Sequence, residues 1–166
     1  MIRAQKSGGD FVDQVRREWS TTFPDVDTSP IEVLARIGRI SAKANHLLDA
    51  TLAPMGVSRA EFDVLSALRR TGRALRASEV TSVTMLSGAS TTKISERLVK
   101  EGLIERLRFE RDARVVLLQL TDAGRDLVDR VFPVRLERDR GLLDGLDADD
   151  LEALSGLLRR VALNVE

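Results

Sequence analysis

The side chains best suited to chemistry with another molecule lie in one polar run, residues 87–104. Those expected to face outward are hydroxyl-bearing or basic: Ser87, Ser90, Thr91, Thr92, Lys93, Ser95 and Arg97. Hydroxyls and cations bind phosphate oxygens and base edges, and no aromatic residue interrupts the run. We therefore expect these residues to bind DNA. The alternative is an ordinary surface helix whose charges are solvated.

The same run is predicted to be a short helix with one buried face. Ser87 can cap its first turn, because the hydroxyl accepts a free backbone N–H. Ile94 and Leu98 lie four residues apart and therefore point the same way, into a core. Gly102 ends the helix, since glycine tolerates the left-handed conformation.

Two further helices precede this one at the spacing of a helix-turn-helix. Residues 58–61 form a capping box, in which serine and glutamate satisfy each other's backbone N–H groups. The helix that follows ends at residues 71–72, and a short helix over 78–84 leads to the next turn. This order of helix, turn and helix is typical of DNA-binding proteins.

Two runs rich in Leu, Val and Ile, 103–109 and 114–120, predict a β-hairpin after the polar helix. Its basic side chains, Arg108, Arg111 and Arg114, are expected to contact DNA. Asp112 is expected to brace one of these arginines and to touch no phosphate itself. The alternative is a solvated hairpin in which Asp112 pairs with an arginine.

Helices are also predicted on both sides of this central region. Apolar spacing predicts helices over 10–20 and 30–53, and Thr28 or Ser29 is placed to cap the second. Thr121 and Asp147 are placed to cap two helices after the hairpin. The apolar stripe of the 30–53 helix is long enough that it usually requires a partner chain.

Composition excludes several classes of function. The chain has no cysteine and one histidine, which excludes disulfides, thiol redox chemistry and a Cys- or His-cluster metal site within one chain. No nucleophile–base pair or glycine-rich phosphate loop indicates an enzyme, and no cofactor is expected. No apolar run is long enough to span a bilayer, so we expect a cytoplasmic protein without a membrane partner.

The charge of the chain is unevenly distributed. The formal net charge is zero, but residues 69–114 hold 11 Lys/Arg against 6 Asp/Glu, a net of +5, which leaves −5 elsewhere. A basic middle between acidic ends is the distribution expected when one face meets nucleic acid.

In this order of elements, the chain resembles the MarR family of winged-helix regulators over roughly residues 30–163. The resemblance rests on three segments, 60–70, 87–104 and 117–124. It implies a mainly α-helical winged helix-turn-helix with a small β-hairpin wing. It also implies a homodimer bound to double-stranded DNA at a pseudo-palindromic operator. The usual role is repression of nearby genes, sometimes including the regulator's own, relieved by a small ligand.

The resemblance divides the chain into three regions. Residues 1–56 are expected to be an N-terminal extension and dimerisation helices, 57–120 the winged-helix DNA-binding domain, and 121–166 C-terminal dimerisation helices. An alternative function is a winged-helix module that binds protein or ligand without recognising specific DNA. Activation, by displacement of another DNA-bound protein, is the alternative to repression.

The sequence departs from the family pattern at two places. The wing tip usually carries Asp-Arg-Arg-Gly, whereas residues 112–115 are Asp-Ala-Arg-Val. Lys93 stands where many members have arginine, and lysine lacks the planar fork that binds guanine with two hydrogen bonds.

A further similarity, to the urate-responsive branch of the family, indicates a ligand pocket. It implies Trp19, Asp63, Lys93 and Arg97 as ligand-binding residues, with Arg106 as an alternative cation, and a small anionic or aromatic ligand. The alternatives are that Trp19 belongs to a dimer core and that Asp63 pairs with a neighbouring arginine on its helix.

Overall fold

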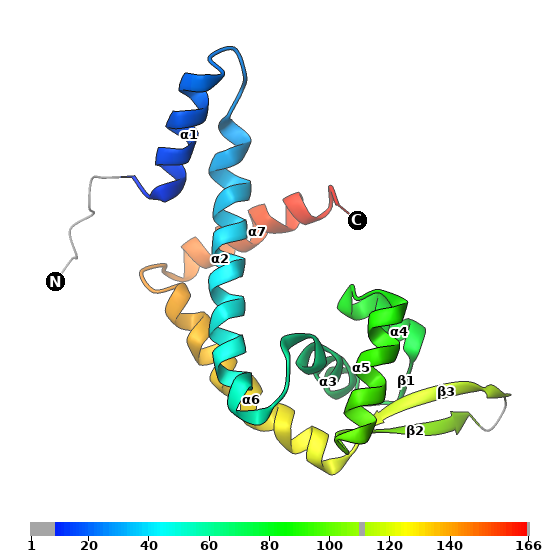
Figure 1. Ribbon diagram of the computed structural model, residues 1–166. Helices are drawn as coiled ribbons and strands as arrows, with labels where there is room; N and C mark the ends of the chain where they lie inside the picture. Colours follow the sequence, from blue (N-terminus) through cyan, green and yellow to red (C-terminus); the bar gives the residue numbers. More distant parts are fainter. Residues whose placement is uncertain (1–8, 110–111, 166) are drawn as a thin grey trace.

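The chain is organised around a small lobe, residues 59–120, from which the long helices over 29–52 and 122–142 extend (Figure 1). The structure is a computed structural model that describes residues 9–109 and 112–165. The elements in chain order are α1 (Phe11–Thr22), α2 (Ser29–Leu52), the 3₁₀ turn η1 (Ala53–Met55), α3 (Arg59–Thr71), β1 (Leu75–Arg76), α4 (Ala77–Thr84), α5 (Gly88–Lys100), β2 (Ile104–Phe109), β3 (Asp112–Leu120), α6 (Asp122–Leu142) and α7 (Ala148–Ala162). The expected fold, mainly helical with a small hairpin wing, is confirmed.

The sheet contains one strand that the sequence did not predict. The three strands lie in the order β1-β3-β2, and both pairings are antiparallel. β1 pairs Leu75 with Leu118, while β2 pairs Ile104 with Leu120. A two-residue strand has no periodicity of its own, so only its pairing with β3 defines it.

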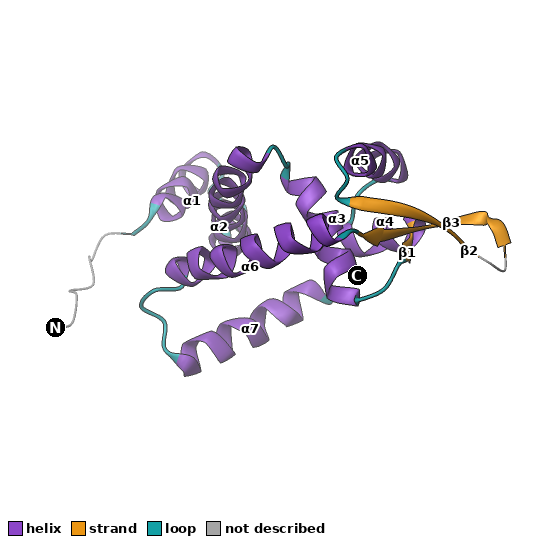
Figure 2. Cartoon of the chain, turned by 90° about the horizontal axis from the view of Figure 1, so that it is seen from below, coloured by secondary structure: helices purple, strands orange, loops and turns teal. Residues whose placement is uncertain are grey.

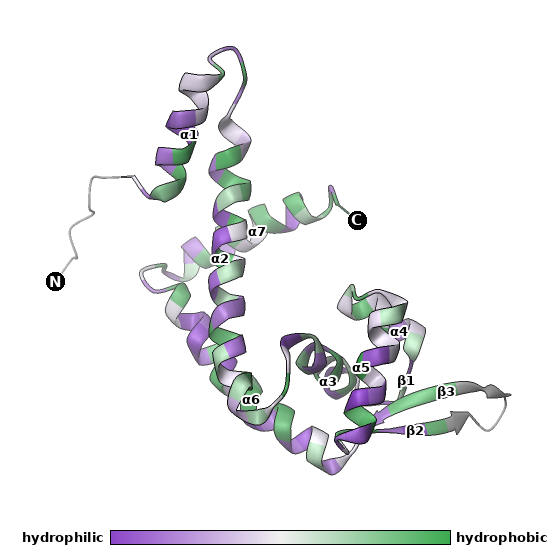
Figure 3. Cartoon of the chain, in the orientation of Figure 1, coloured by the Kyte–Doolittle hydropathy of each residue, from purple (hydrophilic) through white to green (hydrophobic). Residues whose placement is uncertain are grey.

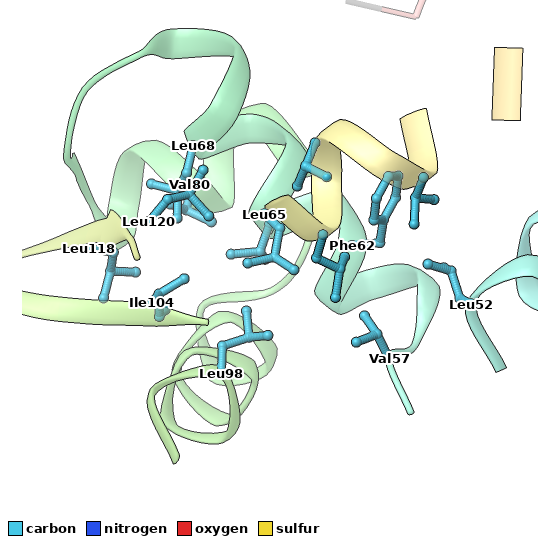
Figure 4. Close-up of a cluster of buried hydrophobic side chains, with 14 of the residues drawn as sticks. Leu52, Val57, Phe62, Leu65, Leu68, Val80, Leu98, Ile104, Leu118 and Leu120 are labelled. Atoms are coloured by element: carbon cyan, nitrogen blue, oxygen red, sulfur yellow. The ribbon is translucent and has the colours of Figure 1, made fainter. Parts of the chain in front are cut away.

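The core joins the helix-turn-helix to the sheet and to α6. Phe62 and Leu65 of α3 are fully buried at its centre, and Leu98 of α5 packs against them from one side (Figure 4). Burying a side chain of this size contributes about 1.5–3 kcal/mol. Because Leu98 is fixed in this core, the opposite face of α5 is held toward solvent.

Local signals determine where most helices begin. The predicted Ser58–Glu61 capping box forms, Ser87 accepts a hydrogen bond from the Ser90 N–H at 3.1 Å, and Asp147 caps α7. Thr28 occupies the cap position of α2, as expected, but its side chain makes no capping hydrogen bond and its hydroxyl instead bonds Ser20 Oγ at 2.7 Å.

The start of α6 packs directly against the turn after α5. The Thr121 hydroxyl accepts from the Gly124 N–H at 3.1 Å and donates to the Gly102 carbonyl at 2.7 Å. A Cβ atom on Gly124 would lie 2.0 Å from the Leu103 carbonyl oxygen. Only glycine therefore allows this approach of helix to backbone.

Replacing Gly124 with alanine is expected to destabilise the protein by about 1–3 kcal/mol, because the backbone must move to relieve the clash. Urea unfolding followed by circular dichroism measures the loss. Gly38→Ala in α2 is the matched control: apart from its chain neighbours and the backbone of its own helix, no described atom lies within 4 Å of the added Cβ, and mid-helix alanine is favoured. Equal stability of Gly124→Ala and the wild type would contradict the packing at this junction.

The helices outside the lobe leave apolar surface uncovered in the single chain. α7, which is described throughout, has no buried residue, and Figure 2 shows it set apart from the rest of the chain. Figure 3 shows hydrophobic residues recurring along α7. Their helical spacing places them on one apolar face, which consists of the exposed residues Leu151, Leu154, Leu157, Leu158 and Val161. Within the described ranges, no helix has the length and apolar character needed to cross a membrane.

Candidate nucleic-acid interface

α5 turns a polar face outward and a mixed face inward. The residues exposed on its outer side recur every three or four positions, so they lie along one stripe. This outer stripe consists of Ala89, Thr92, Lys93, Glu96, Arg97 and Lys100. Ser87 is exposed and Ser90 is partly exposed at the N-terminal end of the helix.

Thr91 and Ser95 were expected to contact DNA, and the structure contradicts this. Thr91 is 1% exposed and Ser95 is 3% exposed. The Thr91 hydroxyl donates to the Ser87 carbonyl at 3.1 Å and accepts from Thr81 Oγ1 at 2.9 Å. The Ser95 hydroxyl donates to the Thr91 carbonyl at 2.7 Å. Both side chains are therefore satisfied within the protein and face the core, on the same side as Leu98.

Lys93 and Lys100 of the outer stripe are both available to an external anion. Both are exposed, and among the described residues neither forms an ion pair. Glu96 lies three residues after Lys93 along the same stripe, and its carboxylate is 4.0 Å from the Arg106 guanidinium of β2. Glu96 was not among the predicted site residues, although its spacing from Lys93 places both on one face.

Arg97 is oriented differently from Lys93. Its Nε lies 3.1 Å from the Glu61 carboxylate, and its Nη2 donates to the Gly56 carbonyl at 2.9 Å. Both partners come from the junction between α2 and α3. The structure therefore engages Arg97 within the protein, whereas the sequence predicted contacts with DNA and with a ligand.

The wing residues lie at or beyond the limit of the described side chains. Arg111 is outside the described residues. Arg108 lies in β2, and Asp112 and Arg114 lie in β3, but their side chains are not described. Their expected roles, DNA contact for the arginines and a brace for Asp112, stay predictions.

A cavity of about 740 Å³ lies between α3, α4 and α6. It is lined by apolar side chains, including Val83 and Phe132, and by polar ones, including Asp63, Ser66 and Arg70. Arg70 has no hydrogen-bond or ion-pair partner among the described residues, while Arg69 at the same cavity pairs with Asp129 at 2.8 Å.

The structure brings only one of the four expected ligand-binding residues to this cavity. Asp63 lines it, whereas Lys93 and Arg97 do not. Trp19 lies on α1 and stacks on Phe23 with 5.7 Å between ring centroids. Figure 1 places α1 at the far end of α2 from α3. Within one chain, the expected cluster of Trp19, Asp63, Lys93 and Arg97 therefore does not form.

Burial raises the pKa of the Asp63 carboxyl above its ordinary value of 3.8, and the positive charges of Arg135 and Arg59 oppose part of that rise. The folded protein thus binds the Asp63 proton more tightly than the unfolded chain does. Ionisation of Asp63 consequently lowers the free energy of unfolding as the pH rises through this pKa.

Asp63→Asn is therefore expected to raise the free energy of unfolding at pH 7. The gain should shrink as the pH falls toward about 4, because the raised pKa keeps more of the wild-type carboxyl protonated in the fold than in the unfolded chain. Urea titrations at the two pH values measure it. Asp126→Asn, at an exposed position of α6, is the control and should change stability by less than about 0.5 kcal/mol at both. A loss of stability in Asp63→Asn at pH 7 would contradict burial as the cause of the raised pKa of Asp63.

Comparison with known proteins identifies the family. The MarR family profile matches residues 55–115, which contain α3, α4, α5 and β2. Over 152 residues the chain is 32% identical to the HTH-type transcriptional regulator PecS of Dickeya dadantii, covering 90% of this chain and 92% of PecS. The chain belongs to the MarR family. It is accordingly a transcriptional regulator and not an enzyme.

Solved MarR-family structures share the fold. A cysteine-to-serine mutant of MarR from E. coli, solved in complex with operator DNA, is 27% identical with a TM-score of 0.69, covering 86% of this chain and 96% of that one. BpsR of Bordetella bronchiseptica, whose DNA binding is regulated by 6-hydroxynicotinic acid, is 26% identical with a TM-score of 0.67. That alignment covers 78% of this chain and 92% of BpsR.

Proposed function

We propose that this MarR-family regulator acts as a homodimeric, ligand-responsive repressor that binds a pseudo-palindromic operator. The observation that carries the proposal is the outer stripe of α5, which presents Lys93 to solvent while Leu98 anchors the opposite face in the core. The operator complex of the related MarR protein supports DNA as the partner.

The outer stripe of α5 enters the major groove in this proposal. Thr92 and Lys93 contact phosphates or base edges, and Glu96 is suited to accept a hydrogen bond from cytosine N4. Ser87 and Ser90 lie at the helix N-terminus, where backbone N–H groups attract phosphate. The wing, with Arg108, Arg111 and Arg114, lies against the neighbouring minor groove, and Asp112 positions one of these arginines.

The second copy of the chain covers the apolar faces left open in one chain. We assign dimerisation to residues 1–56 and 121–166, and DNA binding to residues 57–120. The uncovered face of α7 supports this division, because a helix with that much exposed leucine is unstable alone in water. Two-fold symmetry then places the α5 helix of each subunit, which we call the recognition helix, on one side of the duplex.

The effector site in this proposal is the cavity between α3, α4 and α6. A small anionic or aromatic ligand suits it, because Arg70 supplies a cation and Phe132 and Val83 supply apolar walls. The cavity lies between the helix-turn-helix and α6, so a ligand there favours another spacing of the two recognition helices. Regulation of the related BpsR by 6-hydroxynicotinic acid supports this ligand class.

The proposal is tested by selecting sequences from a random duplex pool with the wild-type protein. We expect an inverted repeat to be enriched and bound with salt-dependent affinity in gel-shift titrations. A match to the region upstream of the protein's own gene is expected if it represses itself. Enrichment of no sequence at low salt would contradict the proposal and favour the alternative, a winged-helix module that binds protein or ligand without specific DNA recognition.

The proposed response to a ligand is tested by an independent measurement. A thermal-shift screen of aromatic carboxylic acids should contain compounds that raise the melting temperature and weaken operator binding. Arg70→Gln should abolish both effects and leave operator affinity without ligand unchanged. Hits whose effects persist in Arg70→Gln would place the effector site elsewhere.

A further inference from the structure

Glu61 is a buried carboxylate in the first turn of α3. Its residue is 3% exposed, although glutamate is among the residues most rarely buried. One carboxylate oxygen accepts from the Ser58 N–H and the Ser58 hydroxyl, both at 2.7 Å. The other oxygen faces Arg97 of α5 at 3.1 Å. The capping box explains the contacts of Glu61 with Ser58, but it does not explain the ion pair of Glu61 with Arg97.

Arg97 connects three elements. Its Nε pairs with Glu61 near the start of α3, and its Nη2 donates to the carbonyl of Gly56 at 2.9 Å. Gly56 follows η1 in the left-handed conformation, with φ of 67°, so it marks the point where the chain leaves α2. One guanidinium thus ties the recognition helix to the end of the long helix α2.

This linkage has a geometric consequence for a dimer. In the proposed function α2 belongs to the dimer base, and α5 enters the major groove. The angle between these helices sets the distance between the two recognition helices, which must match one turn of DNA. A charged pair that fixes this angle controls affinity without touching DNA.

We propose that Arg97 is a positioning residue, which sets the spacing of the two recognition helices through Glu61 and Gly56 and does not bind phosphate or base. This inference rests on the proposed function, because it requires a dimer bound to an operator. It replaces the direct DNA and ligand roles that the sequence predicted for Arg97.

The test measures affinity for the operator selected by the wild-type protein, at several salt concentrations. Arg97→Met keeps the apolar stem and removes the guanidinium. We expect its binding to be roughly 10- to 100-fold weaker, because the coupled pair is broken. The slope of log K against log salt should stay unchanged. Lys93→Met is the comparison, and it should lower the slope by about 1 for each phosphate that Lys93 neutralises.

Glu61→Gln most clearly distinguishes a positioning role of Arg97 from a direct contact between Arg97 and DNA. A positioning role predicts weaker binding, and Arg97→Met combined with Glu61→Gln should be no weaker than the worse single variant. A direct contact between Arg97 and DNA predicts the opposite: Glu61→Gln should leave binding unchanged or tighten it, because a negative charge is removed.

Arg97→Lys and a set of operators with one base pair added or removed at the centre complete the test. Lysine conserves charge but cannot hold Glu61 and the Gly56 carbonyl together, so we expect weaker binding and a reduced preference for one spacing. Arg97→Lys also decides the case if the neutral variants fail to fold. Wild-type affinity in Arg97→Lys, or a lower salt slope in Arg97→Met, would overturn the inference while leaving the proposed function intact. Failure of the wild-type protein to select an operator would overturn both.

Discussion

Replacing Leu154 and Leu158 of α7 with glutamate is expected to convert the proposed dimer into monomers and to weaken operator binding roughly 100-fold or more. Both side chains are exposed in the single chain and belong to the apolar face of α7. Two charges in that face make its burial against a second copy unfavourable. Operator binding then loses the gain that comes from linking two half-site contacts. Sedimentation equilibrium measures the mass, and gel-shift titration measures the affinity.

A matched variant away from the apolar face of α7 controls for charge. Arg159→Gln combined with Arg160→Gln makes the same change in net charge at exposed positions outside the apolar face. It should remain dimeric and keep its operator affinity. Because α7 has no buried residue along its described length, circular dichroism of both variants should show a folded lobe. A dimer of unchanged affinity in the leucine variant would contradict the assignment of α7 to the interface.

Neutralising Lys93 is expected to have the second largest effect. Lys93→Gln removes an exposed cation from the outer stripe of α5, and both subunits lose it at once. We expect the salt slope of operator binding to fall by about 2 for the dimer, with affinity reduced most at low salt. Fluorescence anisotropy of a labelled operator over a range of salt concentrations measures both quantities.

Lys43→Gln is the control for this prediction, because it makes the same chemical change at an exposed position of α2, outside the proposed DNA-binding region. It should leave the salt slope unchanged. An unchanged slope in Lys93→Gln would mean that the outer stripe of α5 does not meet the phosphate backbone. The operator would then have to be bound through another surface of the protein, such as the wing.

The fold was largely predictable because its signals are local. The Ser58–Glu61 box, Ser87 and Asp147 each determine a helix start from within three residues, so the sequence contains the whole interaction. β1 was missed because its definition depends on pairing with β3, which lies far along the chain. A short strand of this kind leaves no pattern in its own segment.

The site was less predictable, for two reasons. Thr91 and Ser95 were assigned to the surface by residue type, although their spacing from Leu98 places them on the buried face. Threonine and serine can face a core because their hydroxyls bond to the helix backbone one turn earlier.

The second reason is distance along the chain. Arg97 meets Gly56 and Glu61, and Asp63 lines a cavity that α3 shares with α4 and α6, through contacts that no local pattern records. Trp19 and Asp63 were grouped by resemblance, and the structure of one chain keeps them apart.

The most direct test of the account is the composition of the complex formed on the selected operator. Native mass spectrometry should find two chains on each duplex, and a duplex that carries one half-site should bind at least roughly 100-fold more weakly. One chain bound to each duplex, with equal affinity for the half-site and the full operator, would contradict the account.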